Sequence, residues 1–269
     1  MRPVWAIVYG ALDPSKGSRA SLCRTLEQAA ALSGPERLVF VGLEQDRPWW
    51  APLLAQYPGA LIIEQPLDRG TGTGVLAATT QVFRRDSNAR VLLLDCADAA
   101  GAELAWPCIL ETVLDPAPFD DRIVLFGSGL VAPELGPGRG APVQVGNLLF
   151  EIDPHLRQGW LDRGALVVMS PMVASVSALL SAGQATHPRT LQTFLSRLEE
   201  HGDLGPILDE LYPFCTEVDL YRDLLAGAWQ QVWVRPIHAA SAEFHSARPM
   251  MVPSDQACRL APVERALAV

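Results

Sequence analysis

The sequence predicts an α/β fold in which a mainly parallel central sheet is covered by helices on both faces. Short continuous apolar runs alternate with helical patterns along the first half of the chain. Strands that are apolar without interruption are buried on both faces, which is typical of parallel strands joined by helices. Hydrophobic residues make up 49% of the 269 residues and charged residues 19%, so the chain can form a sizeable core.

Each element of this sheet is predicted from its local pattern. The expected strands are the apolar runs 4–10, 37–43, 60–65, 89–95 and 122–128. A helix is predicted over 19–32, because Leu22, Leu26 and Ala29 fall on one face at helical spacing. A second helix is predicted over 74–86, between the third and the fourth strand.

The pattern changes after the fifth strand. Residues 129–147 are rich in glycine and proline and are expected to form a loop. The later predicted elements are an antiparallel insertion at 142–153, a strand at 164–171, helices over 172–183 and 189–226, and a strand at 230–237. This organisation predicts one domain over residues 1–248 and a C-terminal tail over residues 249–269.

The charge balance and the cysteines restrict the partners and the compartment. The formal net charge is −9, and an acidic chain has no reason to favour nucleic acid or anionic membranes. No apolar run approaches the roughly 20 residues that span a bilayer. The five cysteines are scattered, odd in number and without CxxC spacing, as thiols in a reducing compartment are. We therefore expect a soluble cytoplasmic protein with no nucleic-acid partner and no membrane insertion.

The stretch EQPLDRGTGTGVLAAT, residues 64–79, is the first candidate site. It is a glycine-rich connection from the third strand to the helix predicted at 74–86. Glycine-rich turns at helix N-termini often hold phosphates, but the known fingerprints follow the first strand. The phosphate-loop pattern GxxxxGK[ST] is also absent. The pattern alone leaves two interpretations open, a phosphate site and a flexible strand-to-helix turn.

Six segments spread along nearly the whole chain carry a more specific signal. They are VWAIV, SLCRTLEQA, EQPLDRGTGTGVL, IVLFGSGLVAPELGPGRG, GALVVMSPMVASVSALL and DLYRDLL. Their order and spacing together resemble those of the sugar nucleotidyltransferases, in particular bacterial mannose-1-phosphate guanylyltransferase. The resemblance implies a Rossmann-like nucleotidyltransferase fold of the GT-A-like type, with three layers. The family joins a sugar-1-phosphate to a nucleoside triphosphate and releases pyrophosphate, mostly through positioning and charge neutralisation.

The resemblance assigns the nucleotide to two places. EQPLDRGTGTG is similar to the segment of the family that meets the base, with Asp68 where the family has asparagine. The turn after the first strand, GALDPSKGSRAS, is much shorter than the family's signature loop and has an alternative interpretation as an exposed turn. The residues that the resemblance implies for nucleotide binding are Gly10, Lys16, Arg19, Gln65, Arg69, Gly70 and Thr71.

The resemblance also implies a Mg²⁺ site, because magnesium prefers oxygen ligands and substrate phosphates. Ala97 falls at the position of the family's metal-binding aspartate, so Asp95 or Asp98 would have to replace it, and Asp98 is the expected ligand. Glu243 is the carboxylate nearest to the family's second metal position and is the other expected ligand. Asp98 has an alternative role as a helix N-cap, since aspartate is favoured there.

The sugar side of the family's site departs from the pattern. The lysine of the family's EKP motif, which meets the sugar phosphate, has no counterpart in FEIDP, residues 150–154. The asparagine that meets a sugar hydroxyl is replaced by Val168. An apolar side chain cannot replace a hydrogen-bond partner, so the remaining polar groups of such a site would go unpaired.

Two classes of function stay open. The favoured one is a catalytically degenerate relative that binds a nucleotide or a nucleoside-diphosphate (NDP) sugar, or that acts as a protein partner or homo-oligomer. The loss of the signature loop, the metal aspartate and the EKP lysine in one chain favours it. The alternative is an active, Mg²⁺-dependent nucleotidyltransferase that makes an NDP-sugar and pyrophosphate.

Overall fold

The computed structural model describes residues 3–10, 18–115, 122–129, 142–238 and 249–253. The strands are β1 (Val4–Tyr9), β2 (Leu38–Leu43), β3 (Leu61–Gln65), β4 (Arg90–Asp95), β5 (Ile123–Gly129), β6 (Val143–Leu149), β7 (Leu166–Ser175), β8 (Val232–His238) and β9 (Met250–Pro253). The α-helices are α1 (Ser18–Ser33), α2 (Arg47–Leu54), α3 (Gly70–Arg85), α4 (Ala99–Leu114), α5 (Pro154–Asp162), α6 (Val176–Thr186), α7 (Pro188–His201) and α8 (Leu208–Leu211). A π-helix, η7, covers Leu220–Leu225.

The described strands form one sheet in the order β3-β2-β1-β4-β7-β5-β8-β6-β9. The pairs β3–β2, β2–β1, β1–β4 and β5–β8 are parallel. In contrast, β7 is antiparallel to both β4 and β5, and β6 is antiparallel to β8 and β9. The prediction of a mainly parallel sheet is therefore corrected to a mixed sheet. A continuous apolar run shows that a strand is buried on both faces, but it does not encode the direction in which the strand runs.

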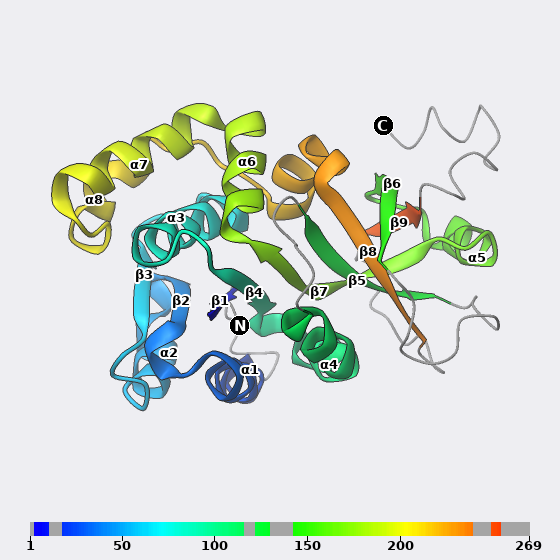
Figure 1. Ribbon diagram of the computed structural model, residues 1–269, viewed down its shortest axis with the longest axis horizontal. Helices are drawn as coiled ribbons and strands as arrows, with labels where there is room; N and C mark the ends of the chain where they lie inside the picture. The colour runs from blue at the N-terminus through cyan, green and yellow to red at the C-terminus, as the bar shows by residue number, and fades with distance from the viewer. Residues whose placement is uncertain (1–2, 11–17, 116–121, 130–141, 239–248, 254–269) are drawn as a thin grey trace.

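Helices cover both faces of the sheet, so the molecule has three layers (Figure 1). Side chains alternate across a strand, and β1 shows the consequence directly. Ala6 and Val8 pack in the core formed with α1, α2 and α4, whereas Ile7 packs in the core formed with α3, α6 and α7. A smaller third core lies around Trp160 of α5. Within the described residues, no helix is long and apolar enough to cross a membrane.

Two boundaries differ from the sequence prediction because pairing with distant strands, which a local pattern does not encode, makes these apolar segments strands. The strand predicted at 164–171 continues as β7 to Ser175, and the helix predicted from 172 begins at Val176. Residues 172–174 instead pair with both β4 and β5. The segment predicted as a tail from 249 contributes the short strand β9, which pairs with β6 and β7.

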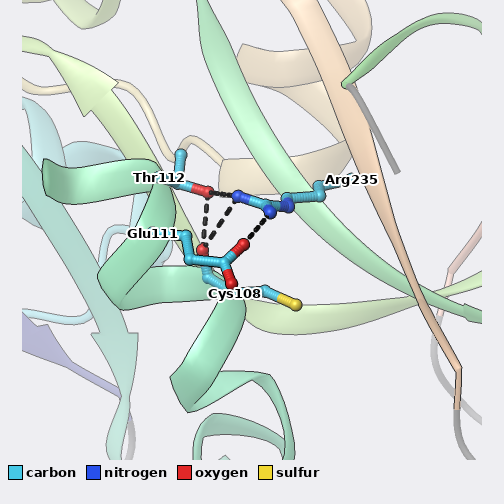
Figure 2. A network of polar contacts seen from close by, with 4 residues as sticks. All are labelled: Cys108, Glu111, Thr112 and Arg235. Atoms are coloured by element: carbon cyan, nitrogen blue, oxygen red, sulfur yellow. Dashed lines mark hydrogen bonds and ion pairs between the residues drawn. The ribbon is translucent and has the colours of Figure 1, made fainter. Parts of the chain in front are cut away.

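A polar network fixes α4 against the sheet (Figure 2). The guanidinium of Arg235, on β8, donates from Nη1 to Thr112 Oγ1 at 2.8 Å and to the carbonyl of Cys108 at 3.3 Å. Its Nη2 pairs with Glu111, and the Arg235 side chain is only 11% exposed. Because α4 leads from the carboxyl end of β4, this network also positions the residues at the start of the helix.

We predict that Arg235→Ala lowers the free energy of unfolding by about 2 kcal/mol, because acceptors on α4 lose a largely buried charged donor. Equilibrium denaturation in urea measures this loss. Arg24→Ala is the control, since Arg24 and its partner Glu103 are both about half exposed, and it should change stability by less than about 0.5 kcal/mol. Equal effects of the two substitutions would contradict the anchoring role.

Candidate functional site

The carboxyl ends of β1 and β4 lie side by side, with Tyr9 opposite Asp95. Gly10 follows β1 with a φ of 127°, and a Cβ at this position would lie 2.4 Å from Asp95 Oδ1. Only glycine therefore allows the chain to leave β1 this close to the carboxylate. Open α/β sheets bind ligands at the carboxyl ends of their parallel strands, so this edge is the candidate site.

Two carboxylates lie at this edge, and both accept hydrogen bonds from the backbone. Asp95 Oδ1 accepts from the amide of Ala97 at 2.8 Å. Asp98 is only 7% exposed. Its Oδ1 accepts from the amide of Gly101 at 3.0 Å, and its Oδ2 accepts from the amide of Ser170 at 3.2 Å. Asp98 is thus the N-cap of α4 and also joins that helix to β7.

Hydroxyl groups surround these carboxylates. Tyr9 and Ser170 are 2% and 7% exposed. Ser170 Oγ has no hydrogen-bond partner among the described residues, and the hydroxyl of Tyr9 meets that of Tyr221. The hydroxyl of Tyr221 donates to the Ser170 carbonyl at 3.3 Å. Burial, followed by the proximity of Tyr221 and Asp95, raises the pKa of Tyr9 well above its usual value of 10.0. Tyr9 therefore stays protonated and keeps a hydrogen to donate.

The side chains predicted to meet a base turn toward the protein. Gln65 is 7% exposed, and its Oε1 accepts from the hydroxyl of Tyr212 at 3.1 Å. Arg69 donates from Nε to the Tyr212 carbonyl and from Nη2 to the Pro213 carbonyl, both at 3.2 Å. These two side chains hold the turn after β3 against the segment at 212–220.

The glycine-rich stretch is helical, which corrects the prediction of a loop up to residue 74. Helix α3 begins at Gly70, whose φ is 77° and whose amide bonds to Asp68 Oδ1 at 2.9 Å. A Cβ on Gly70 would lie 2.4 Å from the carbonyl oxygen of Val218. Thr71 Oγ1 accepts from the amide of Leu220 at 3.3 Å. The glycines allow close contact with a neighbouring segment, and this packing outweighs their low helix propensity.

The π-helix η7 connects the two parts of the edge. Its N-cap, Asp219, accepts at Oδ1 from the amides of Tyr221 and Arg222 at 2.9 and 2.7 Å. Tyr221 extends to Ser170, as described above, and Arg222 forms an ion pair with Glu151. Glu151 has a φ of 52°, the one positive value among the non-glycine residues described. Strained residues and π-helices cluster at functional sites. Tyr221 lies within DLYRDLL, one of the segments that resemble the family, but the resemblance assigned it no role.

Of the remaining predicted site residues, only Arg19 lies within the described part of the chain. Arg19 is exposed on the first turn of α1. Lys16 and Glu243 lie outside the described residues, so their assigned roles stay predictions. Within the described ranges, no group of three or more His, Cys, Asp or Glu side chains is placed to hold a metal ion.

We predict that Asp98→Ala lowers the free energy of unfolding by about 2 kcal/mol, because the amides of Gly101 and Ser170 lose a buried acceptor. Asp98→Asn is the matched variant, since asparagine is an equally good N-cap and its amide oxygen can still accept from Gly101. Its NH2 group cannot accept from the amide of Ser170, so asparagine should retain only part of the stability that alanine loses in a urea titration. A loss for asparagine as large as that for alanine would contradict the capping role.

We also predict that Arg69→Ala destabilises the fold by about 1–2 kcal/mol, because two carbonyls of the 212–214 turn lose their donor. Arg84→Ala provides the control, since Arg84 is exposed on the last turn of α3. Thermal and urea unfolding should show little change for Arg84→Ala. If Arg69→Ala is as stable as the parent protein, the arginine does not hold this turn.

Comparison with known proteins identifies the fold. No protein-family model and no curated protein sequence matches the chain. Mannose-1-phosphate geranyltransferase from Thermus thermophilus matches with a TM-score of 0.68 and 18% identity, over 88% of this chain and 74% of that one. Mannose-6-phosphate isomerase from Helicobacter pylori matches with a TM-score of 0.59 and 10% identity, over 88% and 98% of the two chains. At these identities the matches establish the fold alone, and it is the fold that the sequence resemblance implied.

Proposed function

We propose that this protein is nucleotidyltransferase-like and catalytically degenerate, and that it binds a nucleotide or an NDP-sugar at the carboxyl edge of its sheet. The observation that carries the proposal is the state of Asp98. This carboxylate is nearest in sequence to the expected metal position, and it is buried with one backbone amide on each oxygen. Both oxygens of Asp98 already accept backbone hydrogen bonds that hold the helix and the strand. This carboxylate is therefore poorly suited to coordinate a metal ion whose other ligands change during a reaction.

The described donors do not fit a magnesium site. Mg²⁺ requires near-octahedral oxygen ligands and usually keeps several waters, whereas Asp98 is 7% exposed. The apolar residues Ala97 and Val168 stand at two further positions where the family has polar groups. We therefore derive no step of the proposed function through a metal ion.

Hydrogen bonding at the edge supports binding. Ser170 Oγ is buried without a partner among the described residues, and the hydroxyl of Tyr9 meets that of Tyr221. A buried polar group without a partner is costly. A ligand oxygen, or a water that bridges to a ligand, would satisfy the Ser170 hydroxyl and give Tyr9 a second partner. Gln65 and Arg69 are engaged by Tyr212 and Pro213. We infer that they shape the ligand's surroundings and do not read a base directly.

A second candidate function is that of a partner subunit or homo-oligomer. Phe214 is 88% exposed and Leu67 is 45% exposed, and both lie next to the contacts of Arg69 with the 212–214 turn. Exposed apolar groups that gather in this way can mark an interface. We propose that the protein is located in the cytoplasm, because its five cysteines are scattered and odd in number, as is typical of a reducing compartment.

The test combines ligand-dependent unfolding with a turnover assay. A nucleotide or NDP-sugar at about 100 times its Kd should stabilise the protein by about 2.7 kcal/mol. The Tyr9→Phe variant, which lacks only the hydroxyl, should bind about tenfold more weakly. Pyrophosphate release from nucleoside triphosphates and sugar-1-phosphates should stay far below about 1 s⁻¹, the low end of ordinary enzyme turnover.

The outcomes distinguish the candidates. Turnover at ordinary enzyme rates would overturn the degenerate assignment and establish the active alternative. If no nucleotide and no NDP-sugar shifts the stability, the binding proposal fails and the second candidate, a partner subunit or homo-oligomer, remains. Binding that is unchanged in Tyr9→Phe would place the ligand away from this edge.

A further inference from the structure

A pocket of about 440 Å³ lies between α2 and the edge strand β3, away from the carboxyl edge of β1 and β4. In Figure 1 these two elements lie at one end of the sheet. The pocket is half open and falls in the size range of small-molecule sites. Its lining includes Arg47, Trp50 and Leu54 of α2, Tyr57, and Ile62 and Glu64 of β3. Ile62 is 41% exposed, so this apolar side chain is accessible to a ligand.

One oxygen of Glu64, a carboxylate in the lining of this pocket, lacks a hydrogen-bond donor among the described residues. Glu64 Oε2 pairs with Arg47 Nη2 at 3.2 Å, but Glu64 Oε1 is buried with no partner among the described residues. Arg47 is itself 61% exposed, so most of its guanidinium stays in water. A carboxylate oxygen removed from water without a donor is costly unless another group satisfies it.

The charges around Glu64 favour a cation over an anion. Burial raises the pKa of the Glu64 carboxyl, Arg47 lowers it, and Glu44 and Asp209 raise it further. The charged groups here are therefore three carboxylates, those of Glu64, Glu44 and Asp209, and one guanidinium, that of Arg47. A phosphate-bearing ligand would be repelled here. A protonated amine would instead gain a charge-assisted hydrogen bond, which is stronger than one between neutral groups.

We propose that this pocket binds a small organic cation, a protonated amine attached to a flat apolar body. The ammonium group pairs with the carboxylate of Glu64, whose side chain is 25% exposed, and the apolar body lies on Ile62. The site uses neither Tyr9 nor Asp98 and stands whether or not a nucleotide binds elsewhere.

The experiment uses the full chain and four matched probes in isothermal titration calorimetry. Phenethylamine and tryptamine carry the ammonium group and the ring. 2-Phenylethanol keeps the ring without the charge, and 3-phenylpropionate reverses the charge. We expect the amines to bind at least about tenfold more tightly than the alcohol, and the carboxylate not to bind, because only the amines can pair with Glu64. No binding by either amine, or equal binding of amine and alcohol, would overturn the proposal.

Variants assign the binding to this pocket. Glu64→Gln keeps the shape of the side chain, removes its charge and should weaken amine binding by about tenfold. Ile62→Arg replaces the exposed apolar side chain of the pocket by a guanidinium and should abolish binding of the amines. Glu200→Gln, an exposed glutamate that also pairs with an arginine, is the matched control and should bind amines as the parent does. Amine affinity that is unchanged in both pocket variants would place the site elsewhere and overturn the assignment.

Discussion

The candidate site depends on one buried carboxylate. Asp98 accepts the amide of Gly101 with one oxygen and the amide of Ser170 with the other, so it joins the start of α4 to the middle of β7. The network around Arg235 fixes α4 further along the same helix. Because α4 is held at two places, the carboxyl end of β4 has little freedom to rearrange. The two hydrogen bonds that stabilise the fold thus use both oxygens of the carboxylate that a metal ion would require.

The segment at 212–225 completes the edge from the other side. Two of its carbonyls accept hydrogen bonds from the Arg69 guanidinium, and the hydroxyl of Tyr212 donates to Gln65. The hydroxyl of Tyr221, in the same segment, donates to the carbonyl of Ser170. The turn after β3 and the carboxylates after β4 are therefore parts of one hydrogen-bonded arrangement. The hydroxyl of Ser170 remains without a partner in its described part, and the hydroxyl of Tyr9 meets only that of Tyr221, which is why binding at this edge is the function the geometry supports best.

The sequence predicted the features that depend on local pattern. Continuous apolar runs located β1 to β5, and the preference of aspartate for N-caps offered the role that Asp98 has. Features decided by tertiary contact were missed. Helix α3 begins four residues earlier than predicted, at Gly70, because packing against Val218 outweighs the low helix propensity of glycine. The direction of β7 depends on pairing with strands that are distant in sequence, and so does the approach of Tyr221 to Ser170. A short stretch of sequence does not contain both partners of such a contact.

The central claim is that Asp98 supports structure and does not hold a metal. The most direct measurement is the nucleotide or NDP-sugar affinity of the parent protein and of Asp98→Asn, each titrated with Mg²⁺ and with a chelator. The account predicts that the affinity is the same in all four titrations, because asparagine retains the cap to the Gly101 amide and no metal takes part. A chelator that weakens binding to the parent by about tenfold or more, together with an equal loss in Asp98→Asn with Mg²⁺ present, would contradict it.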